Sequence, residues 1–317
     1  MRILIVGASG FLGRNLITAL PHNWTIFATY NRDITFPAFV KDHRLTNVQG
    51  IHCDLLSKDV QRQIRSVSDI DSCIYLAANT DVPSLVADSR VDVNENIVPL
   101  VNFLEAFRGP RLVFVSSGAV YMGLQGAVSP DVKLSPTIPY SISKLTSEHY
   151  VKFYASGRKA FDQYAIVRFF GSYGYYEAPR KLTRRVLKSA LESDRFAITI
   201  FGDGENLIDV MWVEDVVRGI KALVEAPELN FTADFCAGNA CTINQYVMKL
   251  AQILSKDVVL KHEGVSHEYI KFYASPKRLN DLVGFRPETS LREGIMLYTR
   301  WLSYRTTQNA ENSKEES

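Results

Sequence analysis

The sequence begins with a short apolar run that leads directly into a glycine-rich loop. Residues 2–6 are Arg-Ile-Leu-Ile-Val, and the next seven are Gly-Ala-Ser-Gly-Phe-Leu-Gly, where a helical pattern of apolar residues begins. Glycine is needed where a backbone approaches a pyrophosphate closely or a helix packs tightly on a strand. The free N–H groups at the helix start also favour phosphate. Three glycines alone would equally suit a plain strand–turn–helix. The dinucleotide-binding interpretation therefore depends on the context, a strand before the loop and a helix after it.

Short β-rich runs alternate with helical patterns through the first half of the chain. We expect strands at residues 2–6, 25–29, 48–53, 73–76, 112–116 and 164–169, and helices at residues 11–20, 58–67, 90–107 and 140–156. The strand-like runs are too continuously apolar to be half exposed, which is typical of parallel strands covered by helices on both faces. Right-handed crossovers then predict an α/β fold with a doubly wound parallel sheet of the Rossmann type.

The pattern changes after Gly171, where an aromatic, glycine-rich loop precedes a basic helix. We expect a dinucleotide-binding domain over residues 1–170, with its sheet completed by parts of 205–240. Residues 171–305 would form a smaller α/β unit that mainly binds the substrate. Residues 306–317 are polar and lack periodicity, so we expect a disordered tail there.

Charge and hydropathy argue against several classes of partner. The chain has 36 Lys and Arg against 34 Asp and Glu, a formal net charge of +2, which gives no general attraction to nucleic acid or anionic membrane. No apolar stretch is long enough to span a membrane and no signal peptide is recognisable, so we expect a cytoplasmic protein. The cysteines and histidines form no metal-binding motif, and we therefore expect free thiols and no metal site.

The end of the second predicted strand bears on the choice of dinucleotide. A carboxylate there would bind the adenosine ribose hydroxyls of NAD, whereas an arginine could hold the 2′-phosphate of NADP. Asn31 and Arg32 occupy the tip, and Asp33 follows. We expect NADP or NAD, with NADP slightly favoured because no carboxylate lies at the tip itself. Asp54 and Leu55, after the third strand, could flank the adenine.

Tyr140 and Lys144 lie four residues apart in one predicted helix, so they would share a helix face. A nearby ammonium stabilises a phenolate and lowers the pKa of tyrosine, which lets the phenol exchange a proton with an alcohol or a carbonyl oxygen. Such pairs are common by chance. Here, however, the strand predicted at 112–116 ends at Ser116 and Ser117, whose hydroxyls would face a substrate oxygen.

Taken in order, the motifs resemble those of one family. They are Gly7-x-x-Gly10-x-x-Gly13, Asp54, Leu76-Ala77-Ala78, Asn94, Ser116-Ser117-Gly118-Ala119-Val120-Tyr121, Pro139-Tyr140-x-x-x-Lys144, Arg168-Phe169-Phe170-Gly171-Ser172-Tyr173-Gly174, Phe201-Gly202-Asp203-Gly204, Val213-Glu214-Asp215-Val216 and Leu282-Val283-Gly284-Phe285-Arg286-Pro287. Over residues 1–303 the sequence is similar to the extended short-chain dehydrogenase/reductase family, the NAD-dependent epimerases and dehydratases of sugar nucleotides.

The resemblance implies roles for individual residues. Ser117 would be the catalytic hydroxyl, Tyr140 the acid/base and Lys144 the residue that binds the ribose. The implied cofactor site comprises Gly7, Ser9, Gly10, Phe11, Leu12, Gly13, Asn31, Arg32, Asp54, Leu55, Ala77, Ala78, Asn94, Tyr140 and Lys144. The implied substrate site comprises Thr80, Ser117, Gly118, Tyr173, Arg180 and Arg278. The family commonly forms homodimers through two helices, here residues 90–107 and 140–156.

Some positions depart from the family pattern. Its dehydratases typically carry Asp-Glu after the catalytic hydroxyl, but Gly118 and Ala119 stand here and cannot move a proton, which argues against 4,6-dehydration. The family often has Asn at the position of Gly171 and usually has Arg at that of Ile208, where the Arg grips the nucleotide diphosphate. The basic residues that could compensate, or could simply form a solvated face, are Arg180, Lys181, Arg184, Arg185 and Arg278.

The sequence therefore predicts a nicotinamide-dependent epimerase or ketoreductase that acts on a hydroxyl or keto carbon of a nucleotide-activated sugar, with Tyr140 as acid/base. The missing arginine leaves open an NADPH-dependent reductase of a small carbonyl metabolite without a nucleotide. A nicotinamide-binding sensor without turnover is a third interpretation, less favoured because the tyrosine and the lysine are both present.

Overall fold

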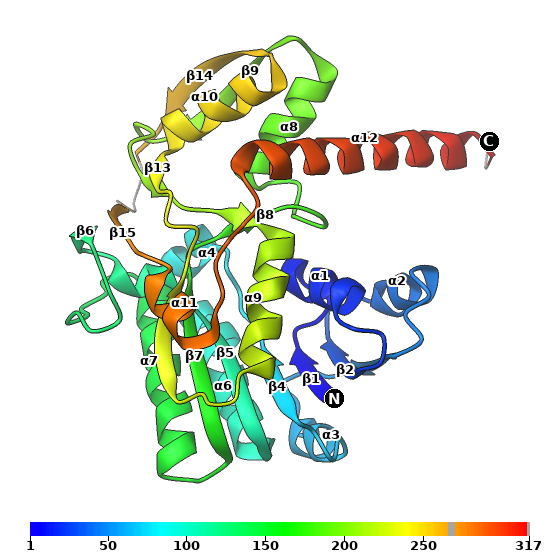
Figure 1. Ribbon diagram of the computed structural model, residues 1–317, viewed down its shortest axis with the longest axis vertical. Helices are drawn as coiled ribbons and strands as arrows, with labels where there is room; N and C mark the ends of the chain where they lie inside the picture. Colours follow the sequence, from blue (N-terminus) through cyan, green and yellow to red (C-terminus); the bar gives the residue numbers. More distant parts are fainter. Residues whose placement is uncertain (266–269, 316–317) are drawn as a thin grey trace.

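The computed structural model describes residues 1–265 and 270–315, with side chains as far as Arg305. In this part of the chain, a seven-stranded parallel sheet forms the centre of the protein (Figure 1). Its strands, in spatial order, are β12 (Phe231–Phe235), β7 (Phe161–Phe169), β5 (Gly109–Ser117), β4 (Ser72–Tyr75), β1 (Arg2–Val6), β2 (Thr25–Tyr30) and β3 (Val48–His52). The predicted doubly wound sheet is confirmed. Its strand order reverses between β1 and β4, and folds of this kind bind ligands in the crevice at that point.

Helices cover both faces of this sheet, which explains why inner strands such as β1 are apolar on both faces. On β1, Ile3 and Ile5 face one core with the helices α1 (Phe11–Ala19) and α9 (Val213–Glu225). Leu4 and Val6 face a second core with α3 (Val60–Arg65), α6 (Val98–Ala106) and α7 (Pro139–Ser156). Two short helices, α2 (Phe36–Asp42) and α4 (Val82–Ala87), lie in connections after β2 and β4.

The segment expected as one helix over residues 90–107 is divided into three. It consists of α5 (Ser89–Asp92), a π-helical turn η1 (Val93–Ile97) and α6. Pro99 explains the division, because its ring has no N–H to donate and would clash with the carbonyl of residue 95 in a regular α-helix. The wider π turn accommodates that carbonyl, and such turns often occur at functional sites.

The second half of the chain builds a smaller α/β unit above the carboxyl ends of the sheet (Figure 1). Its main elements are α8 (Leu182–Glu192), β9 (Arg195–Phe201), α10 (Ile243–Leu254), β14 (Asp257–Glu263) and α12 (Leu291–Glu315), and β9 pairs with β14 in parallel. Shorter elements join the two halves: η2 (Gly118–Tyr121), β6 (Gln125–Ala127), β8 (Ser172–Tyr173), β10 (Leu207–Ile208), β11 (Met211–Trp212), β13 (Cys241–Thr242), β15 (Lys271–Tyr273) and α11 (Lys277–Val283). The unit returns one strand, β12, to the central sheet beside β7.

The C-terminal helix α12 corrects one expectation. The sequence predicts a disordered tail from residue 306, but the helix continues to Glu315, and 316–317 lie outside the described residues. Its first turns pack in the core of the smaller unit through Ile295, Tyr298 and Leu302. A helix that is already formed can extend through residues such as Ala, Gln, Glu and Lys, because these have high helix propensity. None of the helices in the described ranges combines the length and the apolar composition that a bilayer crossing requires.

Candidate active site

The turn between β1 and α1 requires glycine at two positions. Gly7 has a φ of +87°, and a Cβ on it would lie 2.8 Å from the backbone nitrogen of Ala77 at the end of β4. A Cβ on Gly13 would lie 2.5 Å from the Cα of Ala8. Glycine therefore lets β1 turn against the end of β4 and lets α1 pack on the loop. This is a cradle that a dinucleotide pyrophosphate fits, with the amino end of α1 above it.

A cleft of about 600 Å³ follows the carboxyl ends of β1 to β4. Of the residues that the sequence assigns to cofactor or substrate, ten line this cleft: Gly7, Ser9, Asn31, Arg32, Asp54, Leu55, Ala77, Ala78, Thr80 and Arg180. Gly10 caps α1, and Phe11, Leu12 and Gly13 form its first turn directly behind the lining residues. The arrangement thus brings the predicted glycine loop and the residues after β2, β3 and β4 to one continuous surface.

Arg32 is not available as a free cation at the tip of β2. Its Nη2 donates to Oε1 of Glu95 at 2.5 Å, and this contact raises the pKa of Arg32 and lowers the pKa of Glu95. Asp33 lines the same cleft, and its carboxylate accepts a hydrogen bond from Arg14 at 2.6 Å. Partial burial raises the pKa of Asp33, but hydrogen bonds from Thr35 and Arg14 hold it below its ordinary value. The expected preference for NADP, which depends on a free Arg32, is therefore not supported.

Asn96, and not the expected Asn94, is the asparagine of this helical segment whose side chain contacts the residues after β4. Asn94 is exposed in η1 and does not line the cleft. The Asn96 side chain is buried, accepts a hydrogen bond from the backbone N–H of Asn79 at 2.8 Å and donates to the Asn79 carbonyl at 3.1 Å. Its amide also donates to Asp92, one turn earlier, at 2.7 Å. Both asparagines lie in the same π turn, so the contacts with Asn79 distinguish them and the motif alone does not.

Ser117, Tyr140 and Lys144 come from two elements that pack against each other, the end of β5 and the first two turns of α7. Nζ of Lys144 donates to the carbonyl oxygen of Val115 in β5 at 3.2 Å and lies 5.9 Å from the centroid of the Tyr140 ring. Tyr140 and Lys144 are both buried. The Ser117 hydroxyl oxygen accepts a hydrogen bond from the backbone N–H of Ala119 at 3.1 Å.

The lysine is tuned by its surroundings. Burial lowers the pKa of Lys144 to about 8, although the carboxylates of Glu148 and Asp92 act in the opposite direction. At neutral pH the ammonium is therefore still charged, and its position beside Tyr140 lets it stabilise a phenolate. The phenol can then act as a general acid or base on an oxygen at the end of β5.

Behind these residues lies a buried polar network that the sequence does not reveal. Arg168 in β7 donates to both carboxylate oxygens of Glu148 in α7, at 2.8 and 3.0 Å, and Ser116 donates to the same carboxylate at 2.7 Å. Arg168 also donates to the Tyr121 hydroxyl at 2.9 Å, and this hydroxyl donates to Asp234 at 2.7 Å. Burial raises the pKa of Asp234 to about 6. The network ties α7, β5, β7 and β12 together directly behind the candidate catalytic residues.

The predicted substrate residues are not all brought together. Thr80 and Arg180 line the cleft, and Gly118 packs against the ring of Phe170 beside Ser117. Tyr173, by contrast, is buried in the core of the smaller unit, with its ring 5.6 Å from that of Trp212. It belongs to an aromatic cluster from distant segments and does not line the cleft.

The basic residues proposed to replace the missing arginine mostly have structural partners. Arg278 in α11 pairs with Asp131 at 2.7 Å and does not line the cleft. Arg184 and Arg185 donate to the backbone carbonyls of Glu177 and Thr199. Of the candidates, Arg180 alone lines the cleft within the described residues.

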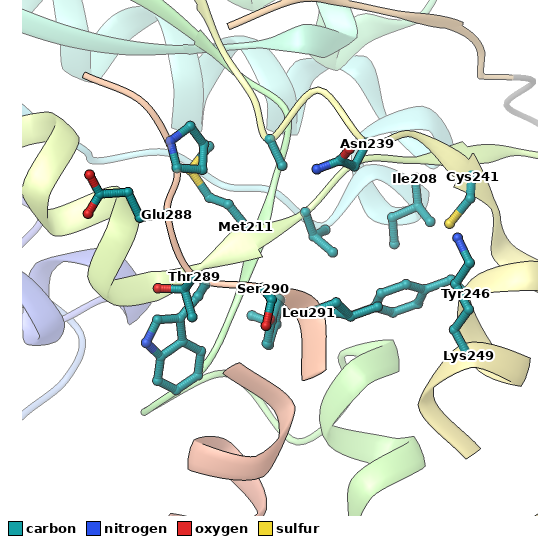
Figure 2. A pocket seen from close by; sticks show the side chains of 15 residues that line it. Ile208, Met211, Asn239, Cys241, Tyr246, Lys249, Glu288, Thr289, Ser290 and Leu291 are labelled. Carbon is teal, nitrogen blue, oxygen red and sulfur yellow. The ribbon is translucent and has the colours of Figure 1, made fainter. Parts of the chain in front are cut away.

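A second cavity of about 400 Å³ lies in the smaller unit (Figure 2). Ile208 and Cys241 lie near Tyr246 and Lys249 at one end of this view, and Glu288 lies at the other. The position at which the family usually has arginine is thus part of an apolar wall, with Lys249 and Glu288 supplying charge among the lining residues.

Comparison with known proteins settles the family. Residues 3–234, more than half of the chain, match the model of the NAD dependent epimerase/dehydratase family. The chain belongs to this family. The resemblance inferred from the motifs is thereby confirmed, and the protein is of the extended short-chain dehydrogenase/reductase type.

Curated members of the epimerase/dehydratase family match almost the whole chain. An uncharacterized UDP-glucose epimerase, YtcB, of Bacillus subtilis is 28% identical, with 96% of this chain and 98% of that protein covered. A dTDP-glucose 4,6-dehydratase of Streptomyces griseus is 25% identical, with 94% and 93% covered. The structure of UDP-glucuronic acid 4-epimerase from Bacillus cereus, in complex with UDP-glucuronic acid and NAD, has a TM-score of 0.84 and 25% identity, and the comparison covers 96% of this chain and 99% of that one.

Proposed function

We propose that this protein is an NAD-dependent epimerase that inverts a hydroxyl carbon, C4 by analogy with its relatives, of a nucleotide-activated sugar. The observation that carries the proposal is the position of Lys144 beside Tyr140, with Ser117 at the end of the adjoining strand β5. These three residues do not line the cleft, but β5 lies beside β4 in the sheet whose strands β1 to β4 end at it. The names of family relatives that span nearly the whole chain, among them UDP-glucose and UDP-glucuronate epimerases, support the substrate class.

The residues of this chain can move the proton that epimerisation requires. Tyr140, as the phenolate, would take the proton of the sugar hydroxyl while the Lys144 ammonium holds the phenolate charge. The Ser117 hydroxyl would donate a hydrogen bond to the same sugar oxygen as it becomes a carbonyl. Tyr140 would return the proton once the carbon has been reduced from its other face. When bound, NAD supplies the acceptor and donor of the hydride, so the cofactor is not consumed.

We infer NAD as the cofactor, for reasons of charge. Arg32 is committed to Glu95, and Asp33 and Asp54 line the same end of the cleft. Carboxylates there accept hydrogen bonds from ribose hydroxyls and repel a 2′-phosphate. NAD in the structure of the Bacillus cereus epimerase supports the same choice.

Particular residues argue against 4,6-dehydration and make net carbonyl reduction the second candidate activity. Gly118 and Ala119 follow Ser117 and have no side chain that can move a proton, which argues against 4,6-dehydration even though dehydratases are among the relatives. Net reduction of a small carbonyl metabolite is the second candidate, because Ile208 lies in an apolar wall where the family usually has a diphosphate-binding arginine.

We further propose that the protein is a homodimer that pairs through α7 and η1. Ile142, Tyr150 and Phe153 form a stripe along α7 and are 45%, 37% and 49% exposed, and Val93 of η1 is 44% exposed. An apolar stripe on an otherwise amphipathic helix suits a self-complementary contact with a second copy across a two-fold axis.

A panel of substrates tests the proposed activity. The purified protein is incubated with UDP-glucose, UDP-glucuronic acid or dTDP-glucose, and the configuration of the sugar is followed by NMR while absorbance at ~340 nm reports the nicotinamide. We expect inversion at C4 of at least one sugar with no net change in absorbance. Stoichiometric loss of added NADPH, without inversion of any sugar, would contradict the epimerase activity and support the reductase activity.

A further inference from the structure

Charged side chains gather at the end of the cleft formed by the tips of β2 and β3. Asp33, Asp54 and Glu95 all line this end, together with the guanidinium group of Arg32. Arg14 pairs with Asp33 but lies outside the lining. The carboxylates therefore outnumber the cations that face the cleft here, and the local field opposes a further negative group.

Glu95 is held in place independently of Arg32. Its Oε2 accepts a hydrogen bond from the Asn79 side chain at 2.6 Å, while its Oε1 faces Arg32. Asn79 is in turn fixed through its backbone by the buried Asn96. The π turn that contains Glu95 and Asn96 brings both side chains toward the residues after β4. A carboxylate anchored in this way keeps its position whether or not Arg32 is present.

Arg32 is the more exposed partner of the pair. Its side chain is 78% exposed, whereas that of Glu95 is 21% exposed. A guanidinium at the tip of the second strand would ordinarily be suited to a 2′-phosphate, because it can donate two parallel hydrogen bonds to it. Here the guanidinium donates to Glu95 instead. A phosphate that approached Arg32 would also approach the anchored carboxylate of Glu95.

We propose that Glu95 determines the preference of this protein for NAD over NADP, by sequestering Arg32 and by placing a fixed negative charge beside the adenosine ribose. The inference rests on the proposed function, since it requires that the cleft bind a nicotinamide dinucleotide. Glu95 is thus a specificity-determining residue that acts from the helix after β4, and not from the strand tip. It explains why an arginine at the tip does not make the site selective for NADP.

The test compares two cofactors in matched variants of the full-length protein. NADH and NADPH are titrated separately, and binding is followed by the fluorescence of the nicotinamide. In Glu95→Gln the amide can keep the contact with Asn79 but releases Arg32, so we expect the ratio of the Kd for NADPH to the Kd for NADH to fall by roughly tenfold, chiefly through tighter NADPH binding. In the double variant Glu95→Gln/Arg32→Ala the gain should disappear, because no guanidinium remains to receive the phosphate.

Asp88→Asn is the matched control. Asp88 pairs with Arg90 at 2.9 Å on the neighbouring helix and does not line the cleft, so its removal changes the net charge by the same amount and should leave the ratio unchanged. If wild type binds NADH and Glu95→Gln leaves the ratio within twofold, this inference is overturned while the proposed function stands. Wild-type protein that binds neither dinucleotide would overturn both.

Discussion

Lys144 donates a hydrogen bond from Nζ to the carbonyl oxygen of Val115, 3.2 Å away, and so fixes the start of α7 against the strand that ends at Ser117. The same ammonium lies 5.9 Å from the centre of the Tyr140 ring. A single cation therefore serves both the packing of the two elements and the chemistry of the phenol. Because the Lys144 ammonium is buried, its pKa depends on the nearby carboxylates of Glu148 and Asp92, and this dependence can be measured.

Activity should decline on the alkaline side as Lys144 loses its proton. Its pKa is lowered to about 8 by burial, while Glu148 and Asp92 raise it, so the ammonium is present below pH ~8 and is lost above it. In Asp92→Asn one of the two supporting charges is gone, and the alkaline limb of kcat/KM should move to lower pH. The pH profile of Asp88→Asn, an exposed change in the same segment, should overlay that of wild type. An alkaline limb that moves equally in both variants, or in neither, would contradict the role of Asp92.

The glycine cradle should fail if Gly7 acquires a side chain. In Gly7→Ala the positive φ of +87° costs about 1–2 kcal/mol, and the contact at 2.8 Å with the backbone of Ala77 adds about 1–3 kcal/mol. Gly123→Ala provides the control, because Gly123 has a φ of +92° and a Cβ added to it would meet no described atom within 4 Å. Urea unfolding should show a loss in Gly7→Ala clearly larger than in Gly123→Ala, and NADH binding should be lost only in the former. Equal losses would mean that backbone strain alone governs this turn.

Removing one partner of the buried pair of Glu148 and Arg168 should strongly destabilise the protein. Their side chains are 2% and 4% exposed, so Glu148→Gln leaves an uncompensated guanidinium in the interior and should lower the free energy of unfolding by about 3–5 kcal/mol. The exposed pair of Lys221 and Glu225 has the same charges in solvent, and Glu225→Gln should cost about 0.5 kcal/mol or less. A loss for Glu148→Gln no larger than that for Glu225→Gln would show that the network does not stabilise the fold.

The proposed dimer predicts a change in molecular mass for one surface variant. Phe153→Glu places a charge in the exposed stripe on α7, and light scattering after gel filtration should then report a monomer. Met248→Glu makes the same change at a residue of similar exposure on α10, away from that stripe, and should leave the dimer intact. The dimer proposal fails if wild type is a monomer or if Phe153→Glu has the mass of a dimer.

The sequence could predict the sheet and the candidate catalytic residues because their signals are local. Inner strands such as β1 are apolar on both faces, and Tyr140 and Lys144 are one helical turn apart with their strand partner just upstream. The contacts that bear on the cofactor are not local. Arg32 meets Glu95 across 63 positions of sequence, so the basic residue taken alone suggests NADP.

Two other differences between sequence and structure have the same origin. Asn94 is expected from the family resemblance, but it is Asn96 that contacts Asn79, 17 positions earlier in the sequence. Tyr173 lies in a loop-like, glycine-rich segment, but its burial depends on Trp212 and on the C-terminal helix far along the chain. Local composition contains no information about such partners.

The role proposed for Tyr140 is to exchange the proton of the sugar hydroxyl, and the most direct measurement of this role compares wild type with Tyr140→Phe. The assay uses whichever nucleotide sugar of the panel wild type inverts fastest, with the dinucleotide bound to each protein quantified in parallel. We predict that Tyr140→Phe binds NAD as wild type does and inverts the sugar at least ~100-fold more slowly. Turnover within a few-fold of wild type, at equal NAD content, would contradict the claim.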